Sequence, residues 1–215
     1  MEEVGEKFNT KTYFQVREQT KKLLLELKDQ IHPGMKEHKA HEIFNQILKS
    51  NKIEKIWHPT KIRFGANTLK SFREPSDEDI VLGTEDLYFI DIGPVIFDHE
   101  GDFGETFQTG ENRELERLIE ASKSLFTLTE KAWREKKLTG SELYSFASEQ
   151  AIKWGYHLNL HMDGHRIGDF PHAIWSKSGL GEINFTPKEQ RWVLEIHLID
   201  KNIQRGAFYE DILGI

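Results

Sequence analysis

The sequence contains no cysteine. This absence excludes disulfide bonds, thiolate zinc sites and cysteine nucleophiles together, and it fits a cytoplasmic protein. A long apolar run is missing too, because no stretch approaches the ~20 residues that a transmembrane helix requires. The first residues, MEEVGEKFNTKTYF, lack the basic and apolar regions of a signal peptide. We therefore expect a soluble, cytoplasmic protein that has no membrane partner.

An excess of basic residues is also absent. The chain has 36 acidic and 29 basic residues and a formal net charge of -7, whereas a nucleic-acid backbone needs a basic surface to bind. We expect no nucleic-acid partner. Of the 215 residues, 37% are hydrophobic and 11% are aromatic, which indicates a globular chain with a substantial core. We expect one domain over residues 1–215, or two closely fused halves.

Apolar periodicity predicts a chain in which helices and strands are mixed. Helices are expected at residues 10–30, 37–51, 112–136 and 139–153. Thr139 or Ser141 should cap the last of them. Strands are expected at residues 56–68, within 86–107, at 191–200 and at 206–215. Residues 69–83 should form a loop, and long loops in compact domains often have a functional role.

The segment 86–107, DLYFIDIGPVIFDHEGDFGETF, carries two aspartates in unusual places. Asp91 interrupts an apolar run that should be a buried strand, and Asp102 follows the turn signal DHEG. A reversal between Val95 and Gly101 would form a β-hairpin and bring Asp102 beside Asp91. Buried carboxylates that repel each other need a compensating charge, for which a metal ion is the commonest source. A turn aspartate and a cap are the simpler alternative.

Further acidic residues and histidines extend this pattern. Glu195 and Glu210 each interrupt an apolar strand segment. Four of the ten histidines, at positions 157, 161, 165 and 172, cluster among glycine-containing turns. Each residue alone could be ordinary, because a strand carboxylate can face solvent and a single histidine is more often a core or surface residue. Together, oxygen donors with one imidazole suit manganese, cobalt, iron or zinc, and shared carboxylates suit two ions about 3.5–4 Å apart.

The order of these residues resembles that of the pita-bread metallopeptidases, which include methionine aminopeptidase, aminopeptidase P and prolidase, with creatinase as a relative. The family pattern is an Asp-x-Gly strand, an aspartate 11 residues later, a histidine in a glycine-rich turn and two late strand glutamates. The matching positions are Asp91 in DIG, Asp102 in GDFGETF, His165 in GHRIG, Glu195 in VLEIH and Glu210 in FYEDIL. The resemblance covers roughly residues 10–215. It implies an α+β pita-bread fold, in which helices cover a curved antiparallel sheet with pseudo-twofold halves.

The spacing of the histidines is most similar to that in the aminopeptidase P and prolidase branch of the family. That branch has one histidine four residues before the metal histidine and another seven residues after it. His161 and His172 have these positions relative to His165. Thr106 and the ending YED at 209–211 also match the branch.

Four features depart from the relatives. Ile196 and His197 follow the first late glutamate, where the branch has proline and glycine, and Arg166 replaces a small residue of methionine aminopeptidase. No histidine lies between His58 and His99, so the substrate-contacting histidine of the relatives is missing. His58 could take that role only if the chain folds back. This chain has no room for the extra N-terminal domain of aminopeptidase P, prolidase and creatinase, so we expect the catalytic domain only.

The resemblance also implies a metal site. It implies two divalent metal ions, with manganese preferred and cobalt, iron or zinc as alternatives. Asp102 and Glu210 would bridge the two ions. Asp91 would bind one of them, and His165 with Glu195 would hold the other. A metal-bridging hydroxide would then attack the substrate.

Three catalytic side chains are expected to act on the substrate. Glu195 would carry a proton between the water and the leaving amine. His161 and His172 would hydrogen-bond the substrate or the tetrahedral oxyanion, and positioned donors of this kind contribute ~10²–10³ in rate.

The function implied by the resemblance is that of a metallo-aminopeptidase, a hydrolase that cleaves an N-terminal peptide bond, with Xaa-Pro bonds as one candidate. Its partner would be a peptide or small-molecule substrate, and a homodimer stays open. One alternative is a hydrolase of a C–N bond in a small metabolite, as in creatinase, which works without a metal. Another is a non-catalytic module that binds peptides or proteins. Retention of all five ligand types argues against both alternatives.

Overall fold

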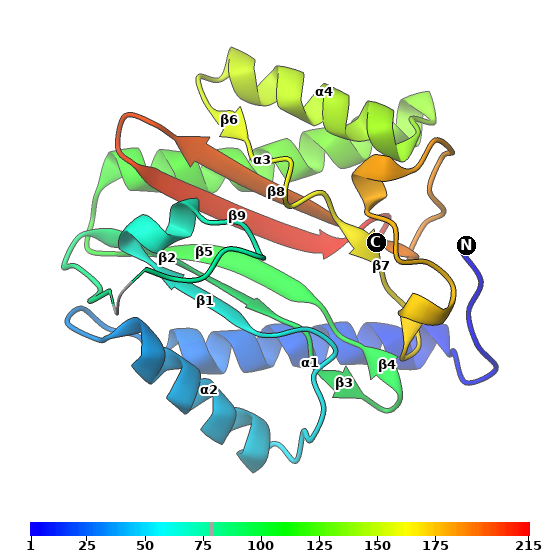
Figure 1. The fold of residues 1–215 in the computed structure, drawn as a ribbon, viewed down its shortest axis with the longest axis horizontal. Helices are drawn as coiled ribbons and strands as arrows, with labels where there is room; N and C mark the ends of the chain where they lie inside the picture. Colours follow the sequence, from blue (N-terminus) through cyan, green and yellow to red (C-terminus); the bar gives the residue numbers. More distant parts are fainter. Residues whose placement is uncertain (78–79) are drawn as a thin grey trace.

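The computed structural model describes residues 1–77 and 80–215. It is an α+β structure with one large curved sheet (Figure 1). The helices are α1 (Thr10–Lys28), α2 (Glu37–Ser50), α3 (Arg113–Lys136) and α4 (Gly140–Lys153), and short 3₁₀ turns are η1 (Gly65–Leu69), η2 (His172–Ile174) and η3 (Leu180–Glu182). The strands are β1 (Lys61–Phe64), β2 (Asp86–Ile92), β3 (Val95–Ile96), β4 (His99–Glu100), β5 (Phe103–Thr109), β6 (His157–Leu158), β7 (His165–Arg166), β8 (Trp192–Asp200) and β9 (Arg205–Ile212).

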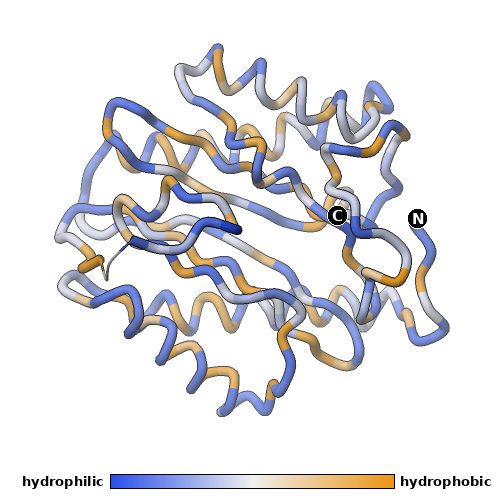
Figure 2. The backbone as a smooth tube through the Cα atoms, viewed as in Figure 1, coloured by the Kyte–Doolittle hydropathy of each residue, from blue (hydrophilic) through white to orange (hydrophobic). Residues whose placement is uncertain are grey.

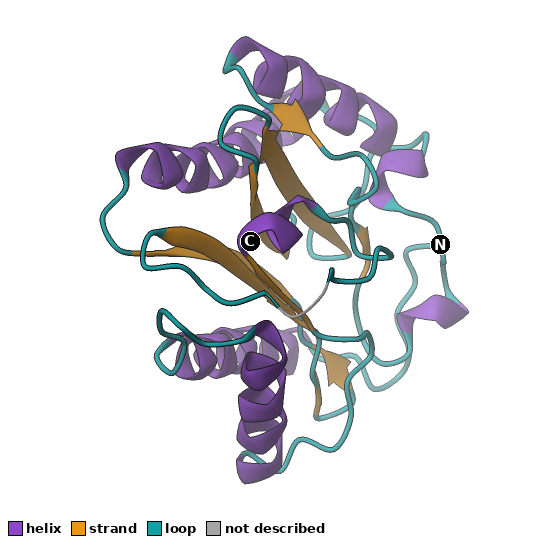
Figure 3. Ribbon diagram, turned by 60° about the vertical axis from the view of Figure 1, so that its left-hand side comes forward, coloured by secondary structure: helices purple, strands orange, loops and turns teal. Residues whose placement is uncertain are grey.

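The sheet is antiparallel and consists of two joined halves. Its strand order is β1-β2-β5-β9-β8-β6, and β7 also pairs with β8. Helices α1 and α2 lie along the half that contains β1, β2 and β5, whereas α3 and α4 lie along the half that contains β6, β8 and β9 (Figures 1 and 3). The short pairing between β5 and β9 joins the halves. This arrangement confirms the predicted α+β fold with a curved antiparallel sheet covered by helices.

Each half has its own apolar core. In the first half, Leu24 of α1 and Phe44 of α2 pack with Ile90 of β2. In the second half, Leu125 of α3 and Leu194 of β8 belong to the corresponding cluster. Burial of one such side chain stabilises a fold by ~1.5–3 kcal/mol. Along the helices, hydrophobic residues alternate with hydrophilic ones, as expected for helices with one buried face (Figure 2). No helix of the described chain is both long and apolar enough to span a bilayer.

Local signals explain where the helices begin. The Asn112 side chain accepts hydrogen bonds from two backbone N–H groups at the start of α3. Thr139 caps α4 in a capping box with Glu142, which decides between the two caps that the sequence offered. The four helices lie within two residues of their predicted bounds.

The prediction for residues 56–68 was wrong in extent. Only Lys61–Phe64 form a strand, because Gly65 has a φ of 54° and the chain then turns into η1. Residues 55–57 pair elsewhere, beside the site described below. In the loop predicted at 69–83, residues 70–77 and 80–83 contain no helix or extended strand, and residues 78–79 lie outside the described part.

Candidate metal centre

Three acidic residues lie in one row across the sheet. The strand register places Asp91 of β2 opposite Gly104 of β5, Gly104 opposite Glu210 of β9, and Glu210 opposite Glu195 of β8. Directly paired residues of neighbouring strands point to the same face. A Cβ atom on Gly104 would lie 2.6 Å from Oε1 of Glu210, so glycine leaves space for this carboxylate. The row therefore brings the three carboxylates together at the centre of the sheet.

The predicted hairpin brings a fourth carboxylate to the row. Between β2 and β5, the chain reverses through the ribbon of β3 and β4, with Phe97 and Asp98 at φ values of 51° and 56°. Such a turn suits the twist of two antiparallel strands. Asp102 stands immediately before β5 and is fully buried. The expected approach of Asp102 to Asp91 is confirmed.

His165 faces the carboxylates from β7. Its Nε2 atom lies 2.9 Å from Oδ2 of Asp102 and 3.6 Å from Oε1 of Glu195. Its Nδ1 atom is 2.7 Å from the backbone oxygen of Arg166. All five positions predicted as metal ligands therefore lie in one cluster, while their roles as ligands stay a prediction.

Burial and neighbouring charges shift the pKa values of the groups in the cluster. Burial raises the pKa of Glu195 to about 8 and the pKa of Asp91 to about 6, and it raises the pKa of Glu210 well above its usual range. Burial would also raise the pKa of Asp102, but the nearby His165 and His58 lower it. Burial would lower the pKa of His165, yet Asp102 and Glu195 raise it to about 10. In the absence of a cation, Glu195 and Glu210 therefore retain protons near neutral pH, whereas Asp102 is ionised.

The residues present fit a divalent metal site. Oε1 of Glu210 is buried and has no hydrogen-bond partner among the described residues, and Oδ2 of Asp102, also buried, has the His165 ring nitrogen 2.9 Å away. An unpaired buried carboxylate oxygen is costly, and a bound cation removes that cost. Two groups have potential ligand atoms that all lie within 4.8 Å of one another: His58 with Asp91 and Asp102, and Asp102 with His165 and Glu210. Carboxylate oxygens combined with imidazole suit manganese, iron, cobalt or zinc.

The chain folds back at His58, as its role in the site would require. Trp57 donates its backbone N–H to the oxygen of Gly93 at 2.9 Å, and Val95 donates to Lys55 at 2.9 Å. This pairing places Nε2 of His58 3.3 Å from Oδ1 of Asp102. The pairing is tertiary, and no local sequence signal announces it.

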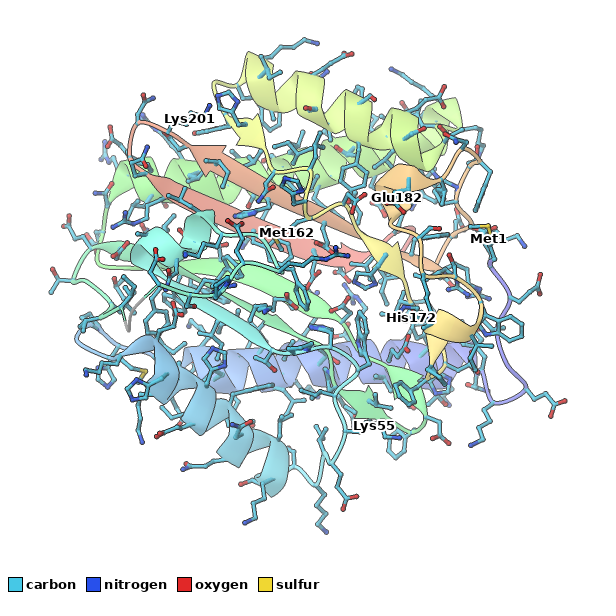
Figure 4. All side chains as sticks on the ribbon, viewed as in Figure 1. Met1, Lys55, Met162, His172, Glu182 and Lys201 are labelled. Atoms are coloured by element: carbon cyan, nitrogen blue, oxygen red, sulfur yellow. The ribbon has the colours of Figure 1, made fainter. Side chains whose placement is uncertain are left out.

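The two histidines that were predicted to be catalytic, His161 and His172, have different surroundings. His161 is exposed and lines the cavity above the carboxylates. The His172 ring stacks on that of His165 with centroids 6.0 Å apart. Nδ1 of His172 lies 2.7 Å from Oε2 of Glu100, a buried acid in the DHEG turn that sequence reasoning missed. Figure 4 shows His172 at the edge of the region around β7. The substrate contacts of both histidines remain predictions.

A cavity of about 280 Å³ opens above the carboxylates. Phe72 and Arg73 contribute to it from the predicted loop, and Lys177 and Glu182 contribute from the segment around η3. The position of Glu182 is marked in Figure 4. The rim of the site is therefore made mostly of loops.

His197, which replaces a family glycine, has a structural role. It is fully buried, its Nε2 atom lies 2.7 Å from the backbone oxygen of Thr68, and its Nδ1 atom lies 3.1 Å from Nδ2 of Asn159. A carbonyl only accepts and an amide nitrogen donates, so these contacts fit a neutral ring. Burial lowers the pKa of His197 to about 4. The side chain links β8 to η1 and to the turn after β6.

Three other residues that the sequence singled out also stabilise the fold. Thr106 exchanges hydrogen bonds with the backbone of Phe208, where β5 meets β9. Asp211 accepts a hydrogen bond of 2.7 Å from Nε of Arg17 on α1, away from the carboxylate row. Arg166 is buried and donates to backbone oxygens of the N-terminal segment, one of them that of Met1 at 3.0 Å.

The fold and the cluster define a metallopeptidase-like protein, and comparison with known proteins gives the family. The model of metallopeptidase family M24 matches residues 13–212, and the chain belongs to this family. No curated protein matches the sequence. The predicted resemblance to the pita-bread metallopeptidases is confirmed, and proteins named prolidase and X-Pro aminopeptidase are among the solved structures that share the fold.

Solved structures with the same fold are distant in sequence. Prolidase from Pyrococcus horikoshii OT3 is 19% identical with a TM-score of 0.71, over 96% of this chain and 60% of that one. X-Pro aminopeptidase from Thermotoga maritima MSB8 is 19% identical with a TM-score of 0.72, over 95% and 58%. Methionine aminopeptidase from Thermotoga maritima is 14% identical with a TM-score of 0.67, over 89% and 87%. The chain thus spans about three fifths of the first two proteins.

Proposed function

We propose that residues 1–215 form a single catalytic domain, a dinuclear-metal-dependent aminopeptidase that hydrolyses an N-terminal peptide bond. The observation that carries this proposal is the meeting of four buried carboxylates and His165 below an open cavity. One of the carboxylate oxygens, Oε1 of Glu210, is buried without a hydrogen-bond partner in the described chain. Membership of metallopeptidase family M24 supports the same reaction class.

The arrangement of the cluster supports the ligand roles that the resemblance implies. Asp91 and Asp102 would hold one ion, and His165 with Glu195 would hold the other. Asp102 belongs to both groups of potential ligands, and Glu210 stands between Asp91 and Glu195 in the row, so these two residues would bind both ions. When bound, the pair of ions supplies activation of water and polarisation of the scissile carbonyl. Manganese is our preferred ion because the donors are mainly oxygen atoms with imidazole.

The remaining chemistry belongs to side chains of this chain. Glu195 accepts a proton from the attacking water at a carboxylate oxygen and delivers it to the leaving amine nitrogen. His161 reaches the substrate from the rim of the cavity, and His172 donates to the substrate or to the oxyanion. Glu100 holds the His172 ring, because its carboxylate accepts from both the backbone N–H and Nδ1 of that residue.

Xaa-Pro bonds are the substrate class to test first. Two structural neighbours are named prolidase and X-Pro aminopeptidase, and the spacing of His161 and His172 about His165 points to the same branch. A cavity of about 280 Å³ is at the small end of ligand sites. The small volume suits a dipeptide or the first residues of a longer peptide.

A second candidate is hydrolysis of a C–N bond in a small metabolite. The small cavity favours it, as do Arg73 and Lys177, two exposed cations that line the cavity. Neither has an ion pair within residues 1–77 and 80–215. Such cations suit a compact substrate that carries a negative charge.

A peptide panel with added Mn²⁺ tests the proposal. Chelator-stripped protein is reloaded with Mn²⁺ and given Xaa-Pro and Met-Ala peptides, and release of the first residue is followed. We expect cleavage that needs the metal and that is lost in Glu210→Ala. Metal binding without cleavage of any peptide would favour the metabolite substrate, and cleavage without metal would contradict the proposal.

A further inference from the structure

Two histidines approach Asp102 in matching ways. Nε2 of His165 lies 2.9 Å from Oδ2 of Asp102, and Nε2 of His58 lies 3.3 Å from Oδ1 of the same carboxylate. Nδ1 of His165 is 2.7 Å from the oxygen of Arg166, and Nδ1 of His58 is 3.1 Å from the oxygen of Pro59. Each imidazole therefore has one nitrogen on a backbone carbonyl and the other on one oxygen of Asp102.

These contacts define which nitrogen can bind a cation. A carbonyl oxygen only accepts, so the hydrogen of a neutral ring is on Nδ1 and the lone pair is on Nε2. Histidines that bind metals usually donate their other ring N–H to a carbonyl or carboxylate, which sets the tautomer and the ring orientation. His58 has this arrangement, so that in the neutral ring the lone pair of Nε2 would face Asp91 and Asp102.

The structure holds His58 in place from several sides. The backbone of Trp57 is paired with Gly93, and Nε1 of Trp57 donates to the oxygen of Gly101 at 2.9 Å. A Cβ atom on Gly93 would lie 2.2 Å from Nε2 of His58, so only glycine permits this approach. His58 is 8% exposed. The ring is thus built into the site and does not merely lie over it.

The distances suit donors that share one ion. Nε2 of His58 is 3.3 Å from Asp102 and 3.5 Å from Oδ1 of Asp91, whereas a charge-assisted N–H···O bond is about 2.7–2.9 Å long. Two neighbouring ligands bound at about 2.1 Å to one ion lie roughly 3.0 Å apart in octahedral and roughly 3.4 Å apart in tetrahedral coordination. The potential ligand atoms of these three residues all lie within 4.8 Å of one another.

We propose that His58 is a metal ligand, whose Nε2 completes the half of the site formed by Asp91 and Asp102. Each of the two ions would then have one imidazole donor, His165 on one side of Asp102 and His58 on the other. This assignment rests on the proposed dinuclear site. An imidazole donor favours manganese, iron, cobalt or zinc over magnesium in that half.

Metal titration of His58→Ala tests the proposal without an activity assay. Chelator-stripped wild type and variant are titrated with Mn²⁺, and bound metal is counted after removal of free ions. The wild type should bind two ions per chain. His58→Ala should keep one at its normal affinity and bind the other at least 10–100-fold more weakly, since even the loss of an outer partner of a ligand has an effect of this size.

His172→Ala is the matched control. Its ring stacks on that of His165, but its Nδ1 atom lies on Glu100 and it belongs to neither group of potential ligands. Both ions should bind with unchanged affinity in this variant. A thermal melt of each metal-free variant checks that it is folded.

A spectroscopic measurement on the wild type keeps the test independent of folding. In protein loaded with two Mn²⁺ ions, pulsed electron paramagnetic resonance should show nitrogen couplings from two imidazoles, and from one in His58→Ala. Couplings from a single imidazole in the wild type, or equal Mn²⁺ affinities in wild type and His58→Ala, would overturn the role of His58 alone. A wild type that binds no metal and cleaves no peptide would overturn the proposed function as well.

Discussion

The acidic residues of the site and the residues around its rim are positioned by different kinds of structure. Asp91, Glu210 and Glu195 lie on paired strands, where the register fixes their neighbours. Phe72, Arg73 and the segment around Lys177 belong to loops. We therefore expect metal binding to depend mainly on the sheet, and selection of substrate to depend on loops that can change without altering the sheet.

Removal of a carboxylate from the row should have the largest effect. Glu210→Ala takes away the carboxylate that stands between Asp91 and Glu195 in the row, so it should prevent loading of the metal pair and lower peptide hydrolysis by at least ~10³-fold. Metal content and the rate of peptide cleavage are measured on the same sample. Glu105→Gln is the control, since Glu105 neighbours the row but pairs with Lys123 on α3. Two bound ions and full activity in Glu210→Ala would refute the ligand assignment.

A change in the backbone of the row should come next. In Gly104→Ala, the new methyl group would lie 2.4 Å from Cε1 of Phe208 and 2.6 Å from Oε1 of Glu210. The rearrangement that such an overlap forces typically destabilises a fold by ~1–3 kcal/mol. The new methyl group should also displace the Glu210 carboxylate. Urea unfolding and metal titration measure the two effects. A variant with wild-type stability and metal affinity would show that the register does not position Glu210.

His197 links the sheet to the loops and should make stability depend on pH. Its pKa in the folded chain is about 4, below the ordinary value of 6.5. As pH falls from about 6.5 to 4, the unfolded chain takes up a proton that the folded chain does not. The stabilisation is therefore present above pH 6.5 and is lost on acidification, by at most ~3 kcal/mol.

Urea unfolding of metal-free protein at several pH values checks this expectation. His197→Gln keeps polar contacts with Thr68 and Asn159 within reach but has no titratable group. Its stability should fall less steeply between neutral and mildly acidic pH. Parallel pH profiles for wild type and variant would exclude the role of His197.

Changes at the rim should have the smallest effect and should spare the metal. Arg73→Gln removes an exposed charge from the cavity wall, and exposed charge pairs contribute only ~0.2–1 kcal/mol. The KM for substrates with a negative group near the cleaved bond should rise by less than about tenfold, with kcat and metal content unchanged. Loss of bound metal in Arg73→Gln would contradict the expected division between the strand carboxylates, which bind metal, and the loop residues of the rim, which contact substrate.

The sequence predicts the strand-borne part of the site because its signals are local. An acid inside an apolar strand, as at Asp91 or Glu195, is visible in a few residues. The turn DHEG likewise predicts the return of Asp102. Family resemblance adds the order of the five positions, and the fold follows from it.

The places of His58 and Glu100 in the site depend on tertiary contacts that the sequence does not reveal. The pairing that brings His58 to the site joins residues 55–57 to 93–95, and nothing in either segment specifies that register. The glycine at Gly93 admits the ring, but glycines also follow strands in many turns where no ring approaches. Glu100 acquires its role only when His172 arrives from a distant loop.

Dependence of peptide cleavage on a metal pair is measured by titration of Mn²⁺ into chelator-stripped protein, with Xaa-Pro peptide cleavage followed in the same samples. We predict two Mn²⁺ ions per chain and a cleavage rate that rises as the site fills. Cleavage before any metal is added, or a chain that binds no Mn²⁺, would contradict the assignment of a dinuclear metallo-aminopeptidase.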